Sequence, residues 1–207
     1  MSDLIVAGIG TEVGKTVVSA ILATLLNADY WKPIQSGEDT DTDTMSTLLD
    51  LEKHKIFPPA YSFKAPLSPH HAARLEKCRI DPSNIKKPIT NKPLIIEMAG
   101  GILVPLNENL LSLDLFSSWN ASWVVVSKHY LGSINHTLLT LEQLKRSNIS
   151  VLGIIFNGEP NLDSEKAILD FSQIPCLGRV LPQKEIHLKT IQQQAEQWQQ
   201  FGILSHR

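Results

Sequence analysis

The feature that most constrains the fold is the stretch LIVAGIGTEVGKTVV, at residues 4–18. Four apolar residues lead into a glycine-containing turn, the turn ends in Gly14-Lys15-Thr16, and a second apolar stretch follows. A strand, a glycine-rich turn ending in Gly-Lys-Thr and a helix are the parts of a phosphate-binding loop, or P-loop. Because this unit joins a buried strand directly to a helix, it predicts an α/β domain.

The residue types in this turn are suited to phosphate. Glycines let backbone N–H groups converge on phosphate oxygens, and the next helix adds the positive end of its dipole. Lys15 would place its ammonium on the β- and γ-phosphates, and Thr16 would offer its hydroxyl to Mg²⁺. The spacing is unusual, because five residues separate Gly8 from Gly14 and three separate Gly10 from Gly14. Despite this spacing, the motif directly follows an apolar strand, and we therefore predict nucleotide binding. The alternative is an ordinary glycine-rich turn.

Later apolar runs predict the remaining strands and helices. Strands are expected at 4–7, 94–97, 123–127 and 151–156, and two more at 29–34 and 174–181. Continuous Val- and Ile-rich runs are typical of parallel strands that are covered on both faces. Helices are expected at 17–26, 44–51 and 134–147, and in the tail, where apolar residues follow helical spacing at Leu188, Ile191, Ala195 and Trp198.

The alternation of strands and helices predicts the fold class and the domain organisation. We expect an α/β protein with a doubly wound, mostly parallel sheet and a P-loop, similar to P-loop NTPases. Residues 1–207 would form a single domain, with an irregular, proline-containing excursion at about 53–92.

Composition narrows the function classes. The net charge is -2 and there is no block of Lys and Arg, so we expect neither a nucleic-acid partner nor an anionic membrane surface. No apolar run approaches the roughly 20 residues of a membrane span, and the start lacks the features of a signal peptide. Cys78 and Cys176 are far apart in the sequence and form no CxxC pair, which argues against a disulfide framework or zinc site. We expect a cytoplasmic protein.

Seven stretches together resemble one family. GIGTEVGKT resembles the modified P-loop of the dethiobiotin synthetases, in which TEVGKT is typical. Six further features match that family in the same order along the chain: WKPIQSG (31–37), Asp43 before an apolar helix, YSFKAPLSPHHAA (61–73), IIEMAGGILVPL (95–106), LGSINHTLLT (131–140) and GIIFN (153–157). The resemblance covers residues 4–160, and the last quarter of the chain matches poorly.

The resemblance implies a reaction of biotin biosynthesis. ATP, CO₂ (or bicarbonate) and 7,8-diaminopelargonate would become dethiobiotin, ADP and phosphate. One amine captures CO₂ as a carbamate, and the carbamate oxygen attacks the γ-phosphate. The second amine then closes the ureido ring and expels phosphate, so that the enzyme is an ATP-dependent cyclo-ligase forming C–N bonds. The resemblance also implies a homodimer with the active site near the subunit interface.

The resemblance assigns catalytic roles to Lys32, Lys15 and Thr11. The two ammonium groups would favour the anionic carbamate and the transferring phosphoryl group. The alternative for Lys32 is a solvated lysine at a strand end. Thr11 and Ser36 would hydrogen-bond the carbamate or the amines. Glu12 would repel phosphate if it pointed inward, so we expect its side chain to point outward.

A magnesium site is expected at Thr16, Asp43 and Glu97. Mg²⁺ takes oxygen ligands, usually including one or two carboxylates. Glu97 ends a buried strand, where an unpaired carboxylate would be costly, and the alternative to a metal is a salt bridge. The stretch EDTDTDTMSTLL offers Asp39, Asp41 and Asp43, and one of them could cap the helix. Alignment to the family favours Asp43.

The remaining site residues also follow from the resemblance. ATP contacts are expected at Glu12, Val13, Gly14, Lys15, Thr16, Val17, Asp43, Glu97, Met98, Ala99, Gly100, Asn157, Gly158, Leu181, Pro182 and Gln183. The side-chain amide of Asn157 can pair with the adenine edge, and the guanine signature NKxD is absent. Met98 stands where the family usually has glycine.

Substrate contacts are expected at Thr11, Ser36, Gly100, Gly132 and Asn135. Gly132 and Asn135 would open a helix whose N-terminal amides hold the substrate carboxylate across the dimer interface. The alternative is an ordinary helix that is N-capped by Ser133.

Three other functions were considered. A cobyrinic-acid amide synthase-like enzyme usually carries a glutaminase domain, for which 207 residues leave no room. A ParA/MinD-like switch ATPase normally has a second lysine early in the loop, where this chain has Gly10-Thr11-Glu12-Val13. The presence of Lys15, Thr16, Lys32, Asp43 and Glu97 argues against a relative that has lost activity.

Overall fold

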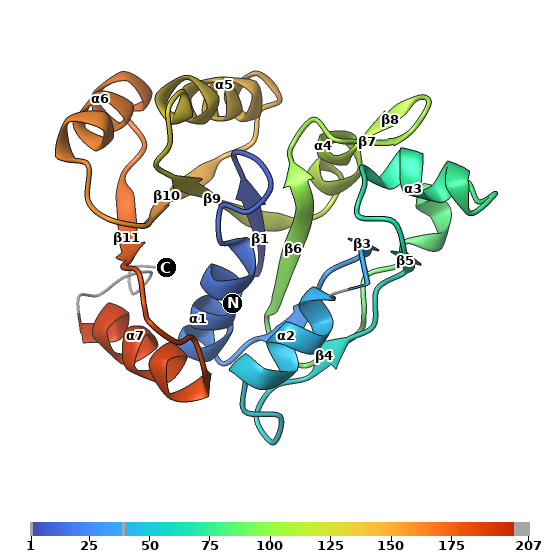
Figure 1. Cartoon of the computed structure of the whole chain (residues 1–207), viewed down its shortest axis with the longest axis horizontal. Coiled ribbons are helices and arrows are strands. Elements are labelled where there is room, and N and C mark those ends of the chain that lie inside the picture. Colours follow the sequence, from blue (N-terminus) through green and yellow to red (C-terminus); the bar gives the residue numbers. More distant parts are fainter. Residues whose placement is uncertain (1, 39, 201–207) are drawn as a thin grey trace.

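A twisted parallel sheet forms the centre of the molecule (Figure 1). The computed structural model describes residues 2–38 and 40–200. The seven strands lie in the order β11-β10-β9-β1-β6-β2-β4, and all neighbours are parallel. Their bounds are β1 (Asp3–Gly8), β2 (Asp29–Trp31), β4 (Ile56–Phe57), β6 (Leu94–Gly101), β9 (Ala121–Lys128), β10 (Val151–Asn157) and β11 (Cys176–Val180).

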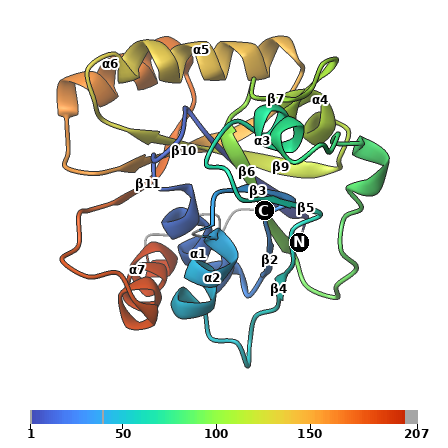
Figure 2. The same cartoon turned by 45° about the vertical axis from the view of Figure 1, so that its right-hand side comes forward.

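Helices cover both faces of this sheet (Figure 2). Two of them, α5 (Ser133–Arg146) and α6 (Leu162–Ser172), pack together on one face. On the other face, α1 (Lys15–Leu26) packs against α2 (Asp41–Leu48) and α7 (Leu188–Gln200). The predicted doubly wound α/β fold is confirmed. No helix of the described residues is long and apolar enough to span a membrane.

The apolar runs of the central strands are explained by this double cover. In β1, Leu4, Ile5, Val6 and Ala7 are all buried, so side chains that point to either face of the sheet meet a layer of helices. The same holds for the run Val124–Val126 in β9. A strand with two covered faces has no reason to alternate apolar and polar residues.

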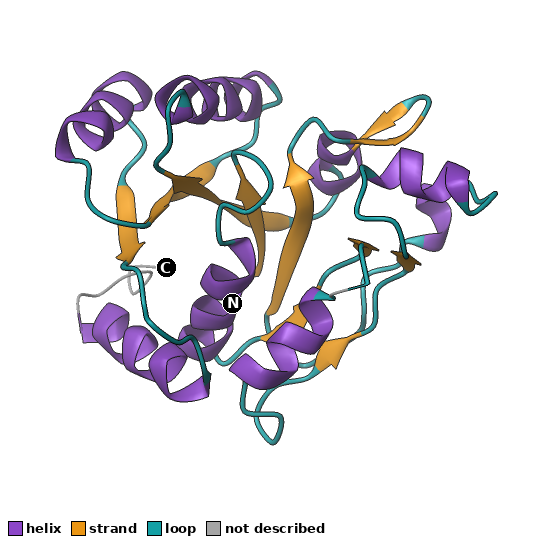
Figure 3. Ribbon diagram, in the orientation of Figure 1, coloured by secondary structure: helices purple, strands orange, loops and turns teal. Residues whose placement is uncertain are grey.

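The predicted strand at 29–34 is two strands. β2 ends at Trp31, and Pro33, which has no N–H group to donate, separates it from β3 (Ile34–Ser36). β3 leaves the main sheet and pairs in parallel with β5 (Tyr61–Phe63) (Figure 3). The turn between β2 and β3 places Lys32 at the carboxyl end of the sheet.

Short elements fill the segment that was expected to be irregular. Residues 53–92 contain β4, which is an edge strand of the main sheet, and β5, α3 (Pro69–Leu75) and a 3₁₀ turn, η1 (Pro82–Asn84). A hairpin of β7 (Pro105–Asn107) and β8 (Leu110–Leu111) follows β6, and it leads into α4 (Ser112–Ser117). The sequence analysis did not predict α3, α4 or α6.

Candidate nucleotide and metal site

The P-loop lies between β1 and α1, and its last glycine is fixed by two constraints. Gly14 is the N-cap of α1 and has φ +91°, in the left-handed region that glycine tolerates best. A Cβ at this position would lie 2.1 Å from Nδ2 of Asn157. That amide group lies across the loop and donates to the carbonyl of Val13 at 2.9 Å. Glycine is therefore favoured at position 14 both by the left-handed backbone conformation and by the lack of space for a Cβ.

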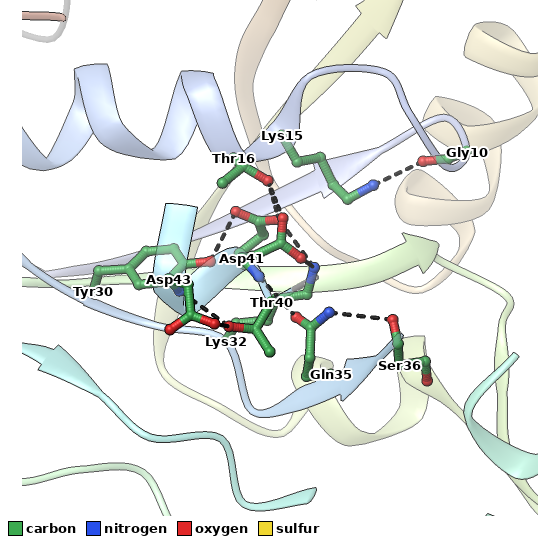
Figure 4. Close-up of polar contacts among 11 residues, drawn as sticks. Gly10, Lys15, Thr16, Tyr30, Lys32, Gln35, Ser36, Thr40, Asp41 and Asp43 are labelled. Carbon is green, nitrogen blue, oxygen red and sulfur yellow. Dashed lines mark hydrogen bonds and ion pairs between the residues drawn. The ribbon is translucent and has the colours of Figure 1, made fainter. Parts of the chain in front are cut away.

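The side chain of Lys15 bonds back to the backbone of the P-loop. Its side chain is buried, and its Nζ donates to the carbonyl of Gly10 at 2.8 Å (Figure 4). The pKa of Lys15 is lowered to about 8, chiefly by burial; the charge of Glu97 opposes this shift, and the charge of Lys32 contributes to it. A bound phosphate would reverse this shift, because an adjacent anion favours the charged form of an amine.

A polar cluster adjoins the P-loop, and we call Thr16, Lys32, Asp41 and Glu97 the Lys32 cluster. Lys32 and Glu97 are buried, and Thr16 and Asp41 are half-buried. The hydroxyl of Thr16 lies 2.6 Å from Asp41 Oδ1 and 3.1 Å from Glu97 Oε1. Lys32 Nζ lies 3.3 Å from Glu97 Oε1 and forms an ion pair with Asp41. β2 and β6 are neighbours, with Trp31 opposite Ile96, and this pairing brings Lys32 beside Glu97. Four segments, namely α1, the turn after β2, α2 and β6, thus meet at the Lys32 cluster.

The charges of the Lys32 cluster stabilise one another. Burial lowers the pKa of Lys32, but the carboxylates of Glu97 and Asp41 more than offset this, so its pKa lies above the ordinary value. Burial raises the pKa of Asp41, but the ammonium of Lys32 and the hydroxyl of Thr16 bring it below the ordinary value. Lys32 is therefore an ammonium and Asp41 a carboxylate at neutral pH.

Tyr30 is a residue of this site that the sequence analysis missed. Its hydroxyl donates to Glu97 Oε2 at 3.1 Å, and both residues are buried. Burial, together with the charge of Glu97, raises the pKa of Tyr30 well above its ordinary value, so the phenol remains a donor. Gln35 was also missed; its Oε1 accepts from the backbone N–H of Asp41 at 3.3 Å. A tyrosine in the middle of a short, fully buried strand was the signal that could have suggested Tyr30.

In this structure the predicted magnesium ligand Asp43 contacts Thr40 at the start of its own helix, and none of its hydrogen bonds within the described residues reaches Thr16 or Glu97. α2 begins at Asp41, with Thr40 as its N-cap, which is earlier than the sequence predicted. The backbone N–H of Asp43 donates to Thr40 Oγ1 at 3.0 Å, and its carboxylate accepts from the same hydroxyl at 2.5 Å. Asp43 is exposed at the helix start, and Asp41 takes the place beside Thr16. Asp39 lies outside the described residues.

Four further residues predicted for the phosphate and substrate side differ in their surroundings. Gly100 has φ +67°, and a Cβ built on it would be 3.6 Å from Thr11 Oγ1. Ser36 Oγ is buried and has no hydrogen-bond partner within residues 2–38 and 40–200. Glu12 is exposed, which agrees with an outward side chain. Met98 is fully buried in the hydrophobic core.

The remaining ATP contacts predicted from the sequence lie at the ends of α1, β6, β10 and β11. Val17 lies in the first turn of α1, and Ala99 lies in β6. Asn157 ends β10 opposite Val180, and the N–H of Gly158 donates to the carbonyl of Val180 at 2.9 Å. The exposed residues Leu181, Pro182 and Gln183 follow Val180 directly. The base-side candidates are therefore neighbours at one edge of the molecule.

Gly132 and Asn135 lie at the start of α5, and none of the hydrogen bonds found within the described chain joins them to the Lys32 cluster. Gly132, with φ +99°, is the N-cap, so the alternative of a helix capped by Ser133 is wrong. Ser133 is instead a buried first residue of the helix.

Comparisons with known proteins agree with this geometry. A protein-family model described as AAA domain matches residues 2–190. The ATP-dependent dethiobiotin synthetase BioD of Chlamydia pneumoniae is 44% identical over 209 residues, covering 100% of this chain and 94% of that protein. The ATP-dependent dethiobiotin synthetase BioD of Cytophaga hutchinsonii is 49% identical over 188 residues, covering 90% of this chain and 91% of that protein.

Solved structures with a similar fold are more distant in sequence. The cell division ATPase MinD of Pyrococcus furiosus has a TM-score of 0.57 and 15% identity, with 97% of this chain and 100% of that chain covered. A putative plasmid partition protein of Borrelia burgdorferi bound to AMPPNP has a TM-score of 0.58 and 11% identity, with 99% and 98% covered. At these identities the likeness shows the fold alone.

Proposed function

The chain belongs to the ATP-dependent dethiobiotin synthetases, and from this premise we propose how its residues carry out the reaction. It is an ATP-dependent ligase of biotin biosynthesis with a P-loop fold. We propose that its substrates are ATP, CO₂ or bicarbonate and 7,8-diaminopelargonate, and that Mg²⁺ is its cofactor. The Lys32 cluster is the single observation that supports this most strongly, because it joins two carboxylates, a hydroxyl and an ammonium beside a P-loop.

The cluster fits a magnesium ion in the chemistry of its donors. The hydroxyl of Thr16 lies within hydrogen-bond reach of both Asp41 and Glu97, and Mg²⁺ binds hard oxygen ligands with one or two carboxylates. Glu97 is only 1% exposed, and in this structure the ammonium of Lys32, 3.3 Å from Oε1, balances its charge, which is the salt bridge that the sequence left open as the alternative to a metal. We propose that Thr16, Asp41 and Glu97 hold Mg²⁺, which when bound would neutralise part of the phosphate charge.

The ammonium groups of Lys15 and Lys32 are the proposed catalytic groups. Lys15 would hold the β- and γ-phosphates, with the N–H groups of the loop from Glu12 to Thr16 around them. Lys32 would hold the carbamate anion and stabilise the charge that develops on the transferring phosphoryl group. A group that remains an ammonium at neutral pH can serve this purpose throughout the reaction.

The substrate is proposed to bind beside Thr11, Ser36 and Gly100. Ser36 carries a buried hydroxyl whose hydrogen-bonding capacity is unused within the described chain, and a carbamate or amine could use it. Gly100 has no Cβ, so it leaves open the space beside Thr11, where a Cβ would lie in van der Waals contact with the hydroxyl at 3.6 Å. The base would lie against Asn157, Gly158 and the segment Leu181–Gln183.

We further propose a homodimer with the active site near the interface. Leu131 and Ile134, at the start of α5, are exposed, and so are Leu139 in the middle of α5 and Leu103 in the loop after β6, which line one pocket. Exposed apolar groups that gather in one region are typical of interfaces. Gly132 and Asn135 would then offer the start of α5 to the substrate carboxylate of the partner subunit. We propose a cytoplasmic enzyme without nucleic-acid or membrane partners, in agreement with its net charge of -2.

The test is phosphate release from ATP and Mg²⁺, with and without diaminopelargonate and bicarbonate. We expect release to require both, and mass spectrometry to detect the ureido product. Lys32→Ala should abolish both signals, whereas Lys166→Ala, which removes an exposed lysine of α6, should leave them unchanged. Steady hydrolysis that is indifferent to the diamine and bicarbonate would instead support a switch ATPase.

A further inference from the structure

A second ion cluster, centred on the buried Glu165, lies at the carboxyl ends of β9, β10 and β11, away from the Lys32 cluster. Glu165, in the first turn of α6, is 6% exposed and accepts from three different segments. Its Oε1 lies 2.9 Å from Nε2 of His129 and 3.0 Å from the backbone nitrogen of Asn161, and its Oε2 forms an ion pair with Arg179. His129 follows β9, Asn161 follows β10, and Arg179 lies near the end of β11.

These three segments are joined through one aromatic ring as well. The imidazole of His129 stacks on Phe156 with a centroid distance of 5.5 Å and an interplanar angle of 18°. The guanidinium of Arg179 lies 5.8 Å from the centroid of the same ring. Phe156 is fully buried and directly precedes Asn157, whose amide donates to the P-loop carbonyl of Val13. The position of Asn157 is thus set partly by this cluster.

From these contacts we infer that Glu165 is a positioning residue for the base end of the nucleotide site. The inference rests on the proposed function, because it takes Asn157, Gly158 and Leu181–Gln183 as the base contacts. Glu165 would touch neither base nor phosphate. Its carboxylate would hold the segments that carry those contacts at a fixed separation.

The hydrogen bonds of Glu165 are of a kind that fixes the positions of its partners more than it raises the stability of the fold. A buried ion pair is weak evidence for stability, since apolar residues of the same volume often stabilise a fold equally well. Hydrogen bonds to charged groups do, however, fix direction and distance. Burial raises the pKa of Glu165, but Arg179, Asn161 and His129 more than offset this and keep it ionised. One carboxylate with three directional partners therefore fixes three segments at once.

The phosphate side gives an internal reference for the test. Inorganic tripolyphosphate carries the phosphates of ATP without the base, so it reports on the P-loop alone. We expect Glu165→Gln to weaken ATP binding by about tenfold and tripolyphosphate binding by less than about twofold. Both dissociation constants would be measured by calorimetry with Mg²⁺ present. KM for ATP should rise, whereas kcat at saturating ATP and KM for the diamine should hardly change.

Asp170→Asn is the matched control, because it removes a carboxylate of the same helix that pairs with Lys166 at the surface. It should leave both dissociation constants unchanged. Arg179→Lys retains the charge but loses the planar fork, and it should shift the ratio of the two constants in the same direction by a smaller factor. If Glu165→Gln does not fold, the ratio of the two dissociation constants of Arg179→Lys tests the inference instead.

A purely structural role of Glu165 would give a different result. An equal weakening of ATP and tripolyphosphate, or no change in either, in the folded variants would overturn the inference. Failure of the proposed function is distinguishable, since it is decided by the ureido product of the wild-type enzyme. The ratio of the two dissociation constants involves no diamine chemistry.

Discussion

At the scale of single residues, Asp41 and Asp43 have different surroundings although only one residue separates them. Asp41 contacts Thr16 and Lys32, whereas Asp43 completes the first turn of α2 with Thr40. We expect Asp41→Asn to lower kcat/KM by about 100-fold and to raise the Mg²⁺ concentration needed for half-maximal rate, because a proposed ligand is lost.

Asp43→Asn is the control for that experiment. It should retain nearly full kcat/KM and reduce the free energy of unfolding by about 0.5 kcal/mol, as expected for a weakened helix start. Magnesium titrations of both variants, with chemical denaturation alongside, check the pair. A larger loss of activity in Asp43→Asn than in Asp41→Asn would restore the assignment made from the sequence.

Gly14 and Gly10 form a second pair of matched positions. Gly14→Ala would combine a left-handed backbone with a Cβ 2.1 Å from Asn157 Nδ2, so we expect a loss of about 2 kcal/mol in stability and of detectable ATP binding. Gly10→Ala meets no atom within 4 Å and should fold normally. Thermal unfolding with and without ATP measures both effects, and a stable, ATP-binding Gly14→Ala protein would refute the steric argument.

Sequence reasoning found some site residues and missed others for physical reasons. Lys15, Thr16, Lys32 and Glu97 stand in motifs whose chemistry is local to the chain, and the structure brings the last three together. Tyr30 joins Glu97 only through the pairing of β2 with β6, which no local pattern shows. The choice between Asp41 and Asp43 depended on where a helix begins: α2 starts at Asp41 instead of at residue 44, and Asp41 is then the carboxylate beside Thr16.

At the scale of elements, α7 packs against α1, the helix that follows the P-loop, and stabilises it. Its buried residues Ile191, Ala195 and Trp198 face the core, and α7 packs against α1. We expect Ile191→Ala to reduce the free energy of unfolding by about 2–4 kcal/mol, from lost burial and the cavity that remains. The exposed Gln193→Ala on the same helix should change it by less than about 0.5 kcal/mol. Denaturant titration measures both free energies of unfolding. If α7 were only loosely attached to the sheet, the two variants would have equal stability.

Element prediction succeeded where the elements were long. Strands β1, β6, β9 and β10 have continuous apolar runs, and α1, α5 and α7 span at least three turns. β4 and β8 contain two residues each, and α3 and α4 contain seven and six, which is too short for a periodic pattern. α6 did carry a usable signal, since Asn161 caps it and acidic residues occupy its first turn.

At the scale of the whole molecule, the exposed leucines of two helices provide a test of the proposed homodimer. Leu139 lies on α5, in the apolar region beside Leu103, and Leu162 lies at the start of α6. We expect Leu139→Glu to give monomers, because a buried, unpaired carboxylate would oppose association. Leu162→Glu should leave the assembly intact.

Sedimentation velocity over a range of concentrations measures the assembly of both variants. The activity of Leu139→Glu should fall with its dimer fraction if the start of α5 serves the partner's substrate. A fully dimeric Leu139→Glu protein would place the interface elsewhere on the molecule.

The position of β1 in the sheet has a consequence for the order of folding. Leu4 pairs with Ile95 of β6 on one side and with Ser122 of β9 on the other, so the strand that carries the P-loop joins partners far along the chain. Closing such long loops costs entropy before any contact repays it, and proteins rich in non-local pairing fold slowly. Folding intermediates that lack β6 or β9 would therefore contain the P-loop sequence without a rigid anion-binding loop. Nucleotide would then bind late in folding and stabilise only those molecules whose central sheet has already formed.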